Sequence, residues 1–503
     1  MAYSRPGVYI SERLLPPVLP GGVTANAAGA VVAPFAQGPE AVTLDSSWYE
    51  FTKYFGGYNA SYPATFQVGA FFSNGGRELY VKRLLADDAS AANVDLVTSG
   101  TALVATVTAK NAGSDGNNLR VVLSAGSVSG TYTLTLYKES GVANDVSDDI
   151  LLERYENIVF DDPTSSDFAE TVINTVSANI QISDSDSGTP VMASPYPLTS
   201  GNNGQAPVDT DYLDYKGTGS SVFEDLSSLD RPLVIFLPAA QSLVSGAASV
   251  YDAASSWAST NSSFVVVETP KDKTVAEAIS FAGSLTDSAF AAVYFPWVFI
   301  ADPLGRGSGA LRKIGPSGSV AGLYLNTDAT PGKGVAKAPA GIGTTVQGVV
   351  SVEKSFSSTD LDLMNASTSP VNPLRQIPGA GLSVMGARTL KQDGTANKYV
   401  NMRRSLSYVS KNLKNLTQFA IFENNDERLW SQIRTQVTVF LNEYRNQGGL
   451  RGTTPAQAFF VKCDAENNTE TSIANGEVHI QVGVALQYPA EFIVIDLSQK
   501  TLV

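Results

Sequence analysis

Few residues of this chain could carry out chemistry by their type and spacing. His479 is the only histidine, so no histidine metal cluster can form and any Ser-His-Asp triad would depend on this one side chain. It lies in the strand-like run of residues 477–481, and we predict an ordinary strand residue. Cys463, the only cysteine, has no histidine near it in sequence and is predicted to be a small buried residue.

Glycine clusters and pairs of acidic residues give equally little indication of a binding or catalytic site. Gly305-Arg306-Gly307-Ser308-Gly309 follows a predicted strand, but a dinucleotide fingerprint needs G-x-G-x-x-G leading into a helix, and here the spacing is wrong and Pro316 follows. Gly341-Ile342-Gly343 is no better, and we expect flexible loops. Asp148-Asp149 and Asp161-Asp162 are interpreted as solvated carboxylates. We therefore predict no catalytic, cofactor-binding or metal-binding residues and no cofactor.

The composition describes a folded chain with an uneven charge. Its 503 residues exceed one average domain and 43% of them are hydrophobic, which favours two to four domains with sizeable cores. Residues 86–200 hold 16 Asp and Glu against 4 Lys and Arg, a net charge of −12, whereas residues 387–462 hold 12 basic against 5 acidic residues, a net charge of +7. An acidic module and a basic module indicate different environments for the two.

Signals for secretion or membrane insertion are weak. The N-terminus lacks the apolar core of a signal peptide. The most apolar run, residues 289–301, is too short for a bilayer and contains Pro296, so we predict a buried strand. A single cysteine excludes an intrachain disulfide and favours a reduced compartment. We expect a soluble protein made in a cytoplasm, without direct membrane insertion.

The order of the patterns predicts an α/β and β multidomain chain. Prolines in residues 1–20 predict an extended N-terminal arm. Residues 21–85 and 206–370 are predicted to form one discontinuous middle α/β domain, with buried strands at 233–237 and 264–267. A helix is expected from Ala276 to Leu285.

Residues 86–205, which separate those halves, are rich in Thr, Val, Ser and Gly. They predict an inserted acidic, β-rich outer domain, a β-sandwich with strands at 103–108 and 131–137 and one helix near 168–179. Because of its acid load we expect this domain to be exposed.

Residues 371–490 predict a C-terminal α/β domain. Apolar residues recur at spacings of three and four along 398–419, which places one stripe on a helix. A second helix is predicted over 426–447, with Asn424 and Glu427 as a capping-box-like start and Gly448 as a C-cap. Strands are expected near 458–462, 477–486 and 491–497, and residues 491–503 form a C-terminal arm or strand.

Several short motifs follow one another along the chain and together cover nearly all of it. They include Arg5-Pro6-Gly7-Val8-Tyr9-Ile10, Phe71-Phe72-Ser73-Asn74-Gly75-Gly76-Arg77, Tyr294-Phe295-Pro296-Trp297, Val371-Asn372-Pro373-Leu374-Arg375, Gly386-Ala387-Arg388-Thr389-Leu390 and Tyr399-Val400-Asn401-Met402-Arg403-Arg404, followed by the C-terminal runs 422–430, 454–464 and 488–492. Each motif is weak alone, but together and in this order they resemble the contractile phage tail sheath proteins, a family also found in related contractile injection systems. Met385 and Gly341 depart from the family pattern, which expects tryptophan and asparagine there.

The resemblance implies a structural subunit of stacked rings around an inner tail tube. Such a sheath is assembled extended and contracts on a signal from the baseplate, which drives the tube through a cell envelope. Since no nucleotide site is visible, the work would come from rearranged subunit contacts, with the extended state kinetically trapped. The implied partners are neighbouring sheath subunits, the tube protein, the baseplate and the tail terminator, with no nucleic acid. The implied location is a virion tail, assembled in the host cytoplasm.

Terminal arms suit such a subunit, because a chain end that adds a strand to a neighbour's sheet ties the two together by main-chain hydrogen bonds. Residues 491–497 are apolar on both faces, so a lone terminal strand there would be an aggregation hazard. An ordinary intrachain strand is the alternative. The candidates for exchange between subunits are Gly7, Val8, Tyr9, Ile10, Phe492, Ile493, Val494 and Ile495.

The basic C-terminal region is expected to face the inner tube through modest, salt-sensitive contacts, and the acidic insert to face outward. The tube-facing candidates are Arg403, Arg404, Lys411 and Lys414. Three alternatives stay open: a sheath of a bacteriocin or secretion-type injector, an α/β enzyme, and a nucleic-acid-binding scaffold that uses the +7 region.

Overall fold

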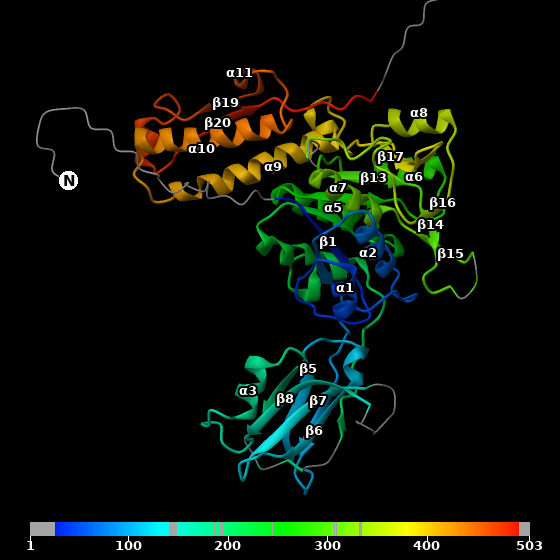
Figure 1. The fold of residues 1–503 in the computed structure, drawn as a ribbon, viewed down its shortest axis with the longest axis vertical. Helices are drawn as coiled ribbons and strands as arrows, with labels where there is room; N and C mark the ends of the chain where they lie inside the picture. Colours follow the sequence, from blue (N-terminus) through cyan, green and yellow to red (C-terminus); the bar gives the residue numbers. More distant parts are fainter. Residues whose placement is uncertain are drawn as a thin grey trace, which may run out of the picture.

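The computed structural model describes residues 26–139, 148–184, 188, 190–191, 195–243, 245–305, 307, 309–330 and 334–491. A large mixed sheet lies at the centre of the molecule. In the view of Figure 1 a β-rich lobe lies below this sheet, and a helical part lies above it.

The central sheet has eight strands in the order β18-β17-β13-β12-β11-β1-β3-β2. The six inner strands run parallel, whereas β18 and β2 are antiparallel to their neighbours. The strands are β1 (Ala28–Ala33), β2 (Thr43–Asp45), β3 (Leu79–Arg83), β11 (Leu233–Phe236), β12 (Phe264–Glu268), β13 (Ala291–Phe295), β17 (Val371–Ile377) and β18 (Gly381–Val384). Continuous apolar runs such as β11 and β12 are buried on both faces, as parallel strands between helices are.

Helices cover both faces of this sheet. On one face α4 (Asp209–Leu213), α5 (Ala247–Thr260), α6 (Val275–Ser284) and α8 (Ser358–Ala366) share a core with alternate strand residues. On the other lie α1 (Trp48–Phe55), α2 (Ala64–Ser73) and α7 (Ser317–Ala329). Gly318 and Gly322 let α7 approach the backbone of α2, because a Cβ at either would clash with a carbonyl oxygen of that helix.

The predicted boundary at residue 371 does not match the sheet. Val371–Ile377 forms β17, which pairs in parallel with β13, and β18 continues the same sheet. Residues 371–384 therefore pack with the middle strands rather than with the C-terminal helices. The apolar run 289–301, predicted as one strand, is two: β13 ends before Pro296, and β14 (Val298–Ala301) joins β15 (Leu311–Ile314) and β16 (Val349–Val352) in a small sheet.

The inserted lobe consists of two sheets around one core. One has the order β4-β5-β9 and the other β10-β6-β7-β8. The elements are β4 (Asn93–Val97), β5 (Leu103–Ala109), β6 (Leu119–Ala125), β7 (Tyr132–Lys138), β8 (Ile150–Ile158), α3 (Ala169–Val176), β9 (Ile180–Asp184) and β10 (Tyr196–Pro197). This is the arrangement expected of the predicted sandwich, and α3 lies where the single helix was predicted.

The C-terminal part begins with two long helices, α9 (Val400–Thr417) and α10 (Glu427–Asn446), close to the predicted ranges. It continues with α11 (Pro455–Ala458), β19 (Phe459–Lys462), α12 (Glu470–Ala474) and β20 (Gln481–Val484). The predicted Asn424 cap is wrong, because Asp426 is the N-cap of α10 and its carboxylate accepts from the Leu429 N–H. Gly448 follows the C-cap Gln447 at φ 83°, which suits glycine after a helix end.

Candidate functional site

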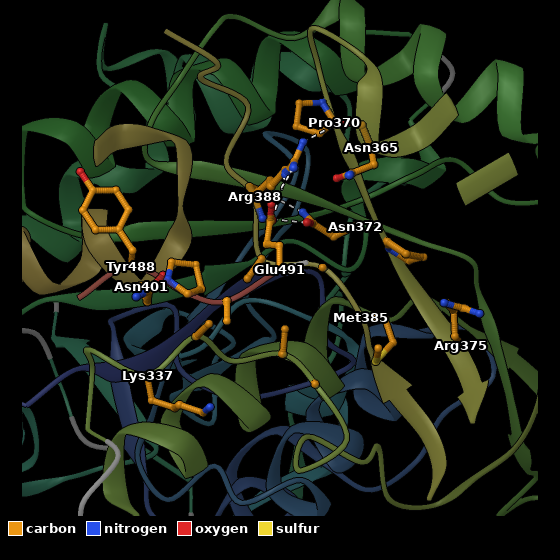
Figure 2. Close-up of a pocket in the computed structure, with 18 of the residues that line it drawn as sticks. Lys337, Asn365, Pro370, Asn372, Arg375, Met385, Arg388, Asn401, Tyr488 and Glu491 are labelled. Carbon is orange, nitrogen blue, oxygen red and sulfur yellow. Dashed lines mark hydrogen bonds and ion pairs between the residues drawn. The ribbon is translucent and has the colours of Figure 1, made fainter. Parts of the chain in front are cut away.

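A cavity of about 560 Å³ lies where the end of the central sheet, α8, the start of α9 and the last described residues meet (Figure 2). Arg375 and Met385 lie toward one side of it in this view, and Lys337 and Tyr488 lie toward the other. This cavity marks the place where the C-terminal segment passes over the middle sheet.

A bidentate ion pair closes one wall of the cavity. The Arg388 Nε donates to Glu491 Oε1 at 3.0 Å and Nη2 donates to Oε2 at 2.6 Å (Figure 2). The Tyr399 hydroxyl donates to the same carboxylate at 3.3 Å. Arg388 holds the pKa of the Glu491 carboxyl below its usual range, against the opposing effect of burial. The pair therefore stays ionised and fixed in geometry.

Asn372 joins this ion pair to the sheet. The Arg388 N–H donates to Asn372 Oδ1 at 2.8 Å, while Asn372 Nδ2 donates to the carbonyl of Arg388 at 2.8 Å and of Val293 at 3.0 Å. Asn372 is 2% exposed on β17, and Val293 belongs to β13. The Glu491 carboxylate is thus connected to the interior of the eight-stranded sheet.

The four cations predicted to face a tube come from one helix, α9, and three of them are held within the chain. Arg404 forms a bidentate pair with Asp328 at the end of α7, with Nη1 3.0 Å from Oδ1, and its guanidinium lies over the Tyr324 ring. Lys411 bonds Asp230. The Arg403 guanidinium lies 4.7 Å from the Phe290 ring centre, where burial lowers its pKa.

Lys414 differs from the other three cations. Its side chain is 64% exposed, and its Nζ lies 3.4 Å from Asp230 Oδ1. Asp230 is half exposed, so its pairs with Lys411 and Lys414 are screened by solvent. The first role of Arg404, Lys411 and Arg403 in this structure is therefore to fasten α9 to the middle domain. Whether any of the four faces a tube stays a prediction.

The strand-exchange candidates Gly7, Val8, Tyr9, Ile10, Phe492, Ile493, Val494 and Ile495 lie outside the described residues. The structure does describe a two-stranded antiparallel sheet, β19 with β20, in register from Phe459↔Val484 to Lys462↔Gln481. Within the described part of the chain, no further strand pairs with either of them. Phe460 on β19 is 53% exposed.

The residues weighed for chemistry have ordinary surroundings. His479 lies just before β20 rather than in it, with a half-exposed ring 3.2 Å from a Glu477 carboxylate oxygen. Cys463 is buried, as predicted, and burial raises the pKa of its thiol. The solvated role predicted for Asp149 is wrong, since its side chain is 0% exposed and lies 3.5 Å from the buried Arg120 guanidinium.

Among the described residues, His, Cys, Asp and Glu nowhere gather in a group of three that could hold a metal ion. In the same part of the chain, no helix is both long and apolar enough to cross a membrane.

Sequence reasoning missed the buried carboxyl groups of Glu268 and Asp45. Glu268, at the end of β12, accepts from Gln67 Nε2 at 3.2 Å and from the Ser317 N–H at 3.3 Å, and burial raises its pKa to about 7. Asp45, on the edge strand β2, has two buried oxygens without a hydrogen-bond partner. Burial and, to a lesser degree, the Glu50 charge raise the pKa of Asp45 to about 7. No pattern in the sequence distinguishes these two acids from solvated ones.

Comparisons with known proteins agree on one class. Residues 392–500 match the family model of the phage tail sheath C-terminal domain. A tail sheath protein of the Vibrio phage KVP40 is 25% identical over 126 residues, which is 25% of this chain and 18% of that protein. The chain therefore aligns with less than a fifth of that curated relative.

Solved structures extend the likeness to the rest of the fold. The sheath of an extracellular contractile injection system, PVC, in its contracted state is 20% identical, with 99% of both chains covered and a TM-score of 0.58. The contracted helical sheath of the anti-feeding prophage gives 20% identity, 99% and 100% coverage and the same score. A sheath tail protein from Listeria innocua gives 13% identity, 93% and 96% coverage and a TM-score of 0.63.

These findings confirm the resemblance to contractile tail sheath proteins. The fold is that of a contractile sheath protein.

Proposed function

We propose that this chain is the structural subunit of a contractile sheath, which polymerises as stacked rings around an inner tube. In this proposal the sheath contracts from a metastable extended state and drives the tube through a cell envelope. One observation carries it: the fold corresponds over 99% of the chain to a sheath solved in the contracted state. The role is structural and needs no cofactor.

Neighbouring subunits are the first proposed partners. The two-stranded sheet β19–β20 packs against α10, and no described strand pairs with its two outer edges. Added strands would satisfy the main-chain groups at those edges. We propose that residues 7–10 of one neighbour and residues 492–495 of another supply them, which makes the sheath a mesh.

The inner tube is the second proposed partner. Lys414 is the strongest of the four cationic candidates, because its side chain is 64% exposed whereas Arg404 and Lys411 are held by carboxylates of the middle domain. A half-satisfied surface lysine gives a weak, salt-sensitive contact, which suits a sheath that must release its tube. A baseplate and a terminator complete the proposed partners, and the acidic insert faces outward.

Two settings suit such a subunit: a phage tail assembled in the host cytoplasm, and an injection system without a phage head. Coverage of 99% or more of both chains by the PVC and anti-feeding prophage sheaths favours the second. The family match of the C-terminal domain is equally compatible with the first.

Electron microscopy of the purified chain tests the proposal. We expect wide ringed tubes, alone or on co-expression with the cognate tube protein, because the contracted lattice is the state of lower free energy and needs no fuel. Monomers under both conditions would contradict a sheath role.

Charge reversal of Lys414 tests the proposed contact with the tube. It should weaken tube-templated assembly at low salt and have little effect at high salt. Unaffected assembly at low salt would contradict a contact between Lys414 and the tube.

A further inference from the structure

The last described segment, residues 487–491, is fastened at both ends to different parts of the molecule. At its start, the Gln487 carbonyl accepts from Asn401 Nδ2 at 3.0 Å, and Gln487 Nε2 donates to the Leu450 carbonyl at 2.9 Å. These contacts tie Gln487 to the C-terminal domain. At its end, Glu491 is tied to Arg388 and through it to the central sheet.

Arg388 is fully engaged in this connection. Its Nε and Nη2 hold the two Glu491 oxygens, and Nη1 donates to the Asn365 carbonyl at the end of α8 at 2.7 Å. The side chain is 9% exposed, so the pair is largely removed from solvent. A planar guanidinium in bidentate contact resists both sliding and rotation of the carboxylate.

The backbone of Arg388 completes the path into the sheet. Asn372 accepts from its N–H and donates to its carbonyl, and the same amide group bonds Val293 on β13. A pull on Glu491 is therefore resisted by β17 and β13, two interior strands of the eight-stranded sheet. Without Arg388 the segment would keep only the 3.3 Å hydrogen bond from the Tyr399 hydroxyl to Glu491 and the contacts of Gln487, all of which lead to the C-terminal domain rather than to the central sheet.

We propose that Arg388 anchors the C-terminal arm. When a second copy of this chain pulls on residues 492–503, Arg388 transmits that force to the eight-stranded sheet. This inference rests on the proposed sheath function, since only a polymer pulls on the arm. In this proposal the β19–β20 pair accepts strands from neighbouring subunits. The force on the chain's own C-terminal arm is carried by Arg388 and the central sheet rather than by β19–β20. Arg388 is a positioning residue in this account.

Proteolysis of the full chain at low concentration tests the anchor without a polymer. A glutamate-specific protease cuts after Glu491 only when this side chain leaves its partner. In Arg388→Met we expect the rate of that cut, followed by mass spectrometry of the released C-terminus, to rise by at least about tenfold, the factor that loss of a charged hydrogen bond gives. Arg375→Met is the matched control: Arg375 lines the same cavity, and we expect an unchanged rate. Equal rates in the two variants would overturn the anchor.

Far-UV circular dichroism checks that Arg388→Met folds. If it does not, Arg388→Lys takes its place, since lysine keeps the charge but cannot hold both carboxylate oxygens. A wild-type cleavage rate in Arg388→Lys would then overturn the proposal, and a faster one would support it.

Assembled sheaths test the load path. We expect Arg388→Met sheaths to dissociate at a lower guanidinium concentration than Arg375→Met sheaths, and equal resistance would overturn the transfer of load. If the wild-type chain forms no polymer, the proposed function fails, whereas the proteolysis result on Arg388 still stands. The two failures are therefore distinguishable.

Discussion

Arg83 donates from Nη2 to Asn203 Oδ1 at 3.1 Å, across the junction between the inserted β-rich lobe and the central sheet. Arg83 ends β3 and is 0% exposed, and Asn203 lies where the chain returns from the lobe. The same guanidinium donates to the carbonyls of Phe35 at 3.1 Å, Gly38 at 2.9 Å and Ala112 at 2.6 Å. One buried arginine thus joins the end of β3 to the loop of residues 35–38, to Ala112 in the lobe and to Asn203 in the returning connection.

Replacement of Arg83 should loosen the lobe. In Arg83→Met several carbonyls and Asn203 lose their donor in a buried place, so we expect a loss of about 2–4 kcal/mol in the free energy of unfolding. Guanidinium denaturation measures this loss, and small-angle scattering should show a broader distribution of lobe positions. Arg154→Met, an exposed change within the lobe, should leave both unchanged. Scattering identical to that of wild type would show that Arg83 does not set the lobe orientation.

The pair between Arg404 and Asp328 should dominate the docking of α9. Their side chains are 6% and 13% exposed, so Arg404→Met leaves a nearly buried carboxylate without its partner and should cost about 3–5 kcal/mol. Lys414→Met on the same helix removes a mostly exposed charge and should change stability by less than about 0.5 kcal/mol. Chemical denaturation of both variants compares them directly. Equal stability in the two would contradict a fastening role for Arg404.

Sequence reasoning succeeded where a pattern is local. The stripe at spacings of three and four along 398–419 predicts α9, and the helix predicted over 426–447 matches α10 to within a few residues. The runs at 233–237 and 264–267 predict β11 and β12. These elements are defined by residues close in sequence, whose periodicity follows directly from the helix or strand geometry.

Sequence reasoning failed where a contact or a domain boundary depends on residues that are distant in the sequence. Lys411 was identified as a cation, but its partner Asp230 lies 181 positions away, and Glu491 lies 103 positions from Arg388. The boundary at 371 was placed too early because parallel pairing of β17 with β13 leaves no local signal. Charge and periodicity in the sequence identify a buried or charged side chain that must be paired. The tertiary structure determines which residue pairs with it.

The two buried acids predict a stability that falls as pH rises. Asp45 and Glu268 have pKa values raised to about 7 in the folded chain, above those of unfolded carboxyls. Between about pH 4.5 and 7 these two groups therefore bind more protons in the folded chain than in the unfolded chain, so their contribution to the free energy of unfolding decreases with pH in that window. Asp45→Asn removes one of these two contributions to the pH dependence. The substitution breaks no hydrogen bond, because neither Asp45 oxygen has a hydrogen-bond partner.

We expect Asp45→Asn to be more stable than wild type at pH 8 by about 1–4 kcal/mol, and this advantage should shrink steadily as the pH falls toward about 4, the usual pKa of an unfolded aspartate. Urea denaturation across this pH range measures the difference. Glu277→Gln is the control of opposite sign, because hydrogen bonds from Thr274 lower the pKa of Glu277 to about 2. An offset between Asp45→Asn and wild type that does not change with pH would contradict titration of Asp45.

Removal of the terminal arms should separate folding from polymerisation. A chain without residues 492–503, or without residues 1–20, keeps the sheet, the lobe and the α9–α10 pair, so we expect thermal unfolding within a few degrees of the full chain. It should nevertheless form no tubes, because the proposed added strands of β19–β20 are missing. Removal of residues 498–503 alone is the matched control and should leave tube formation intact, since the exchange candidates end at Ile495. Tubes formed by a chain that lacks both arms would show that the mesh does not depend on strand exchange.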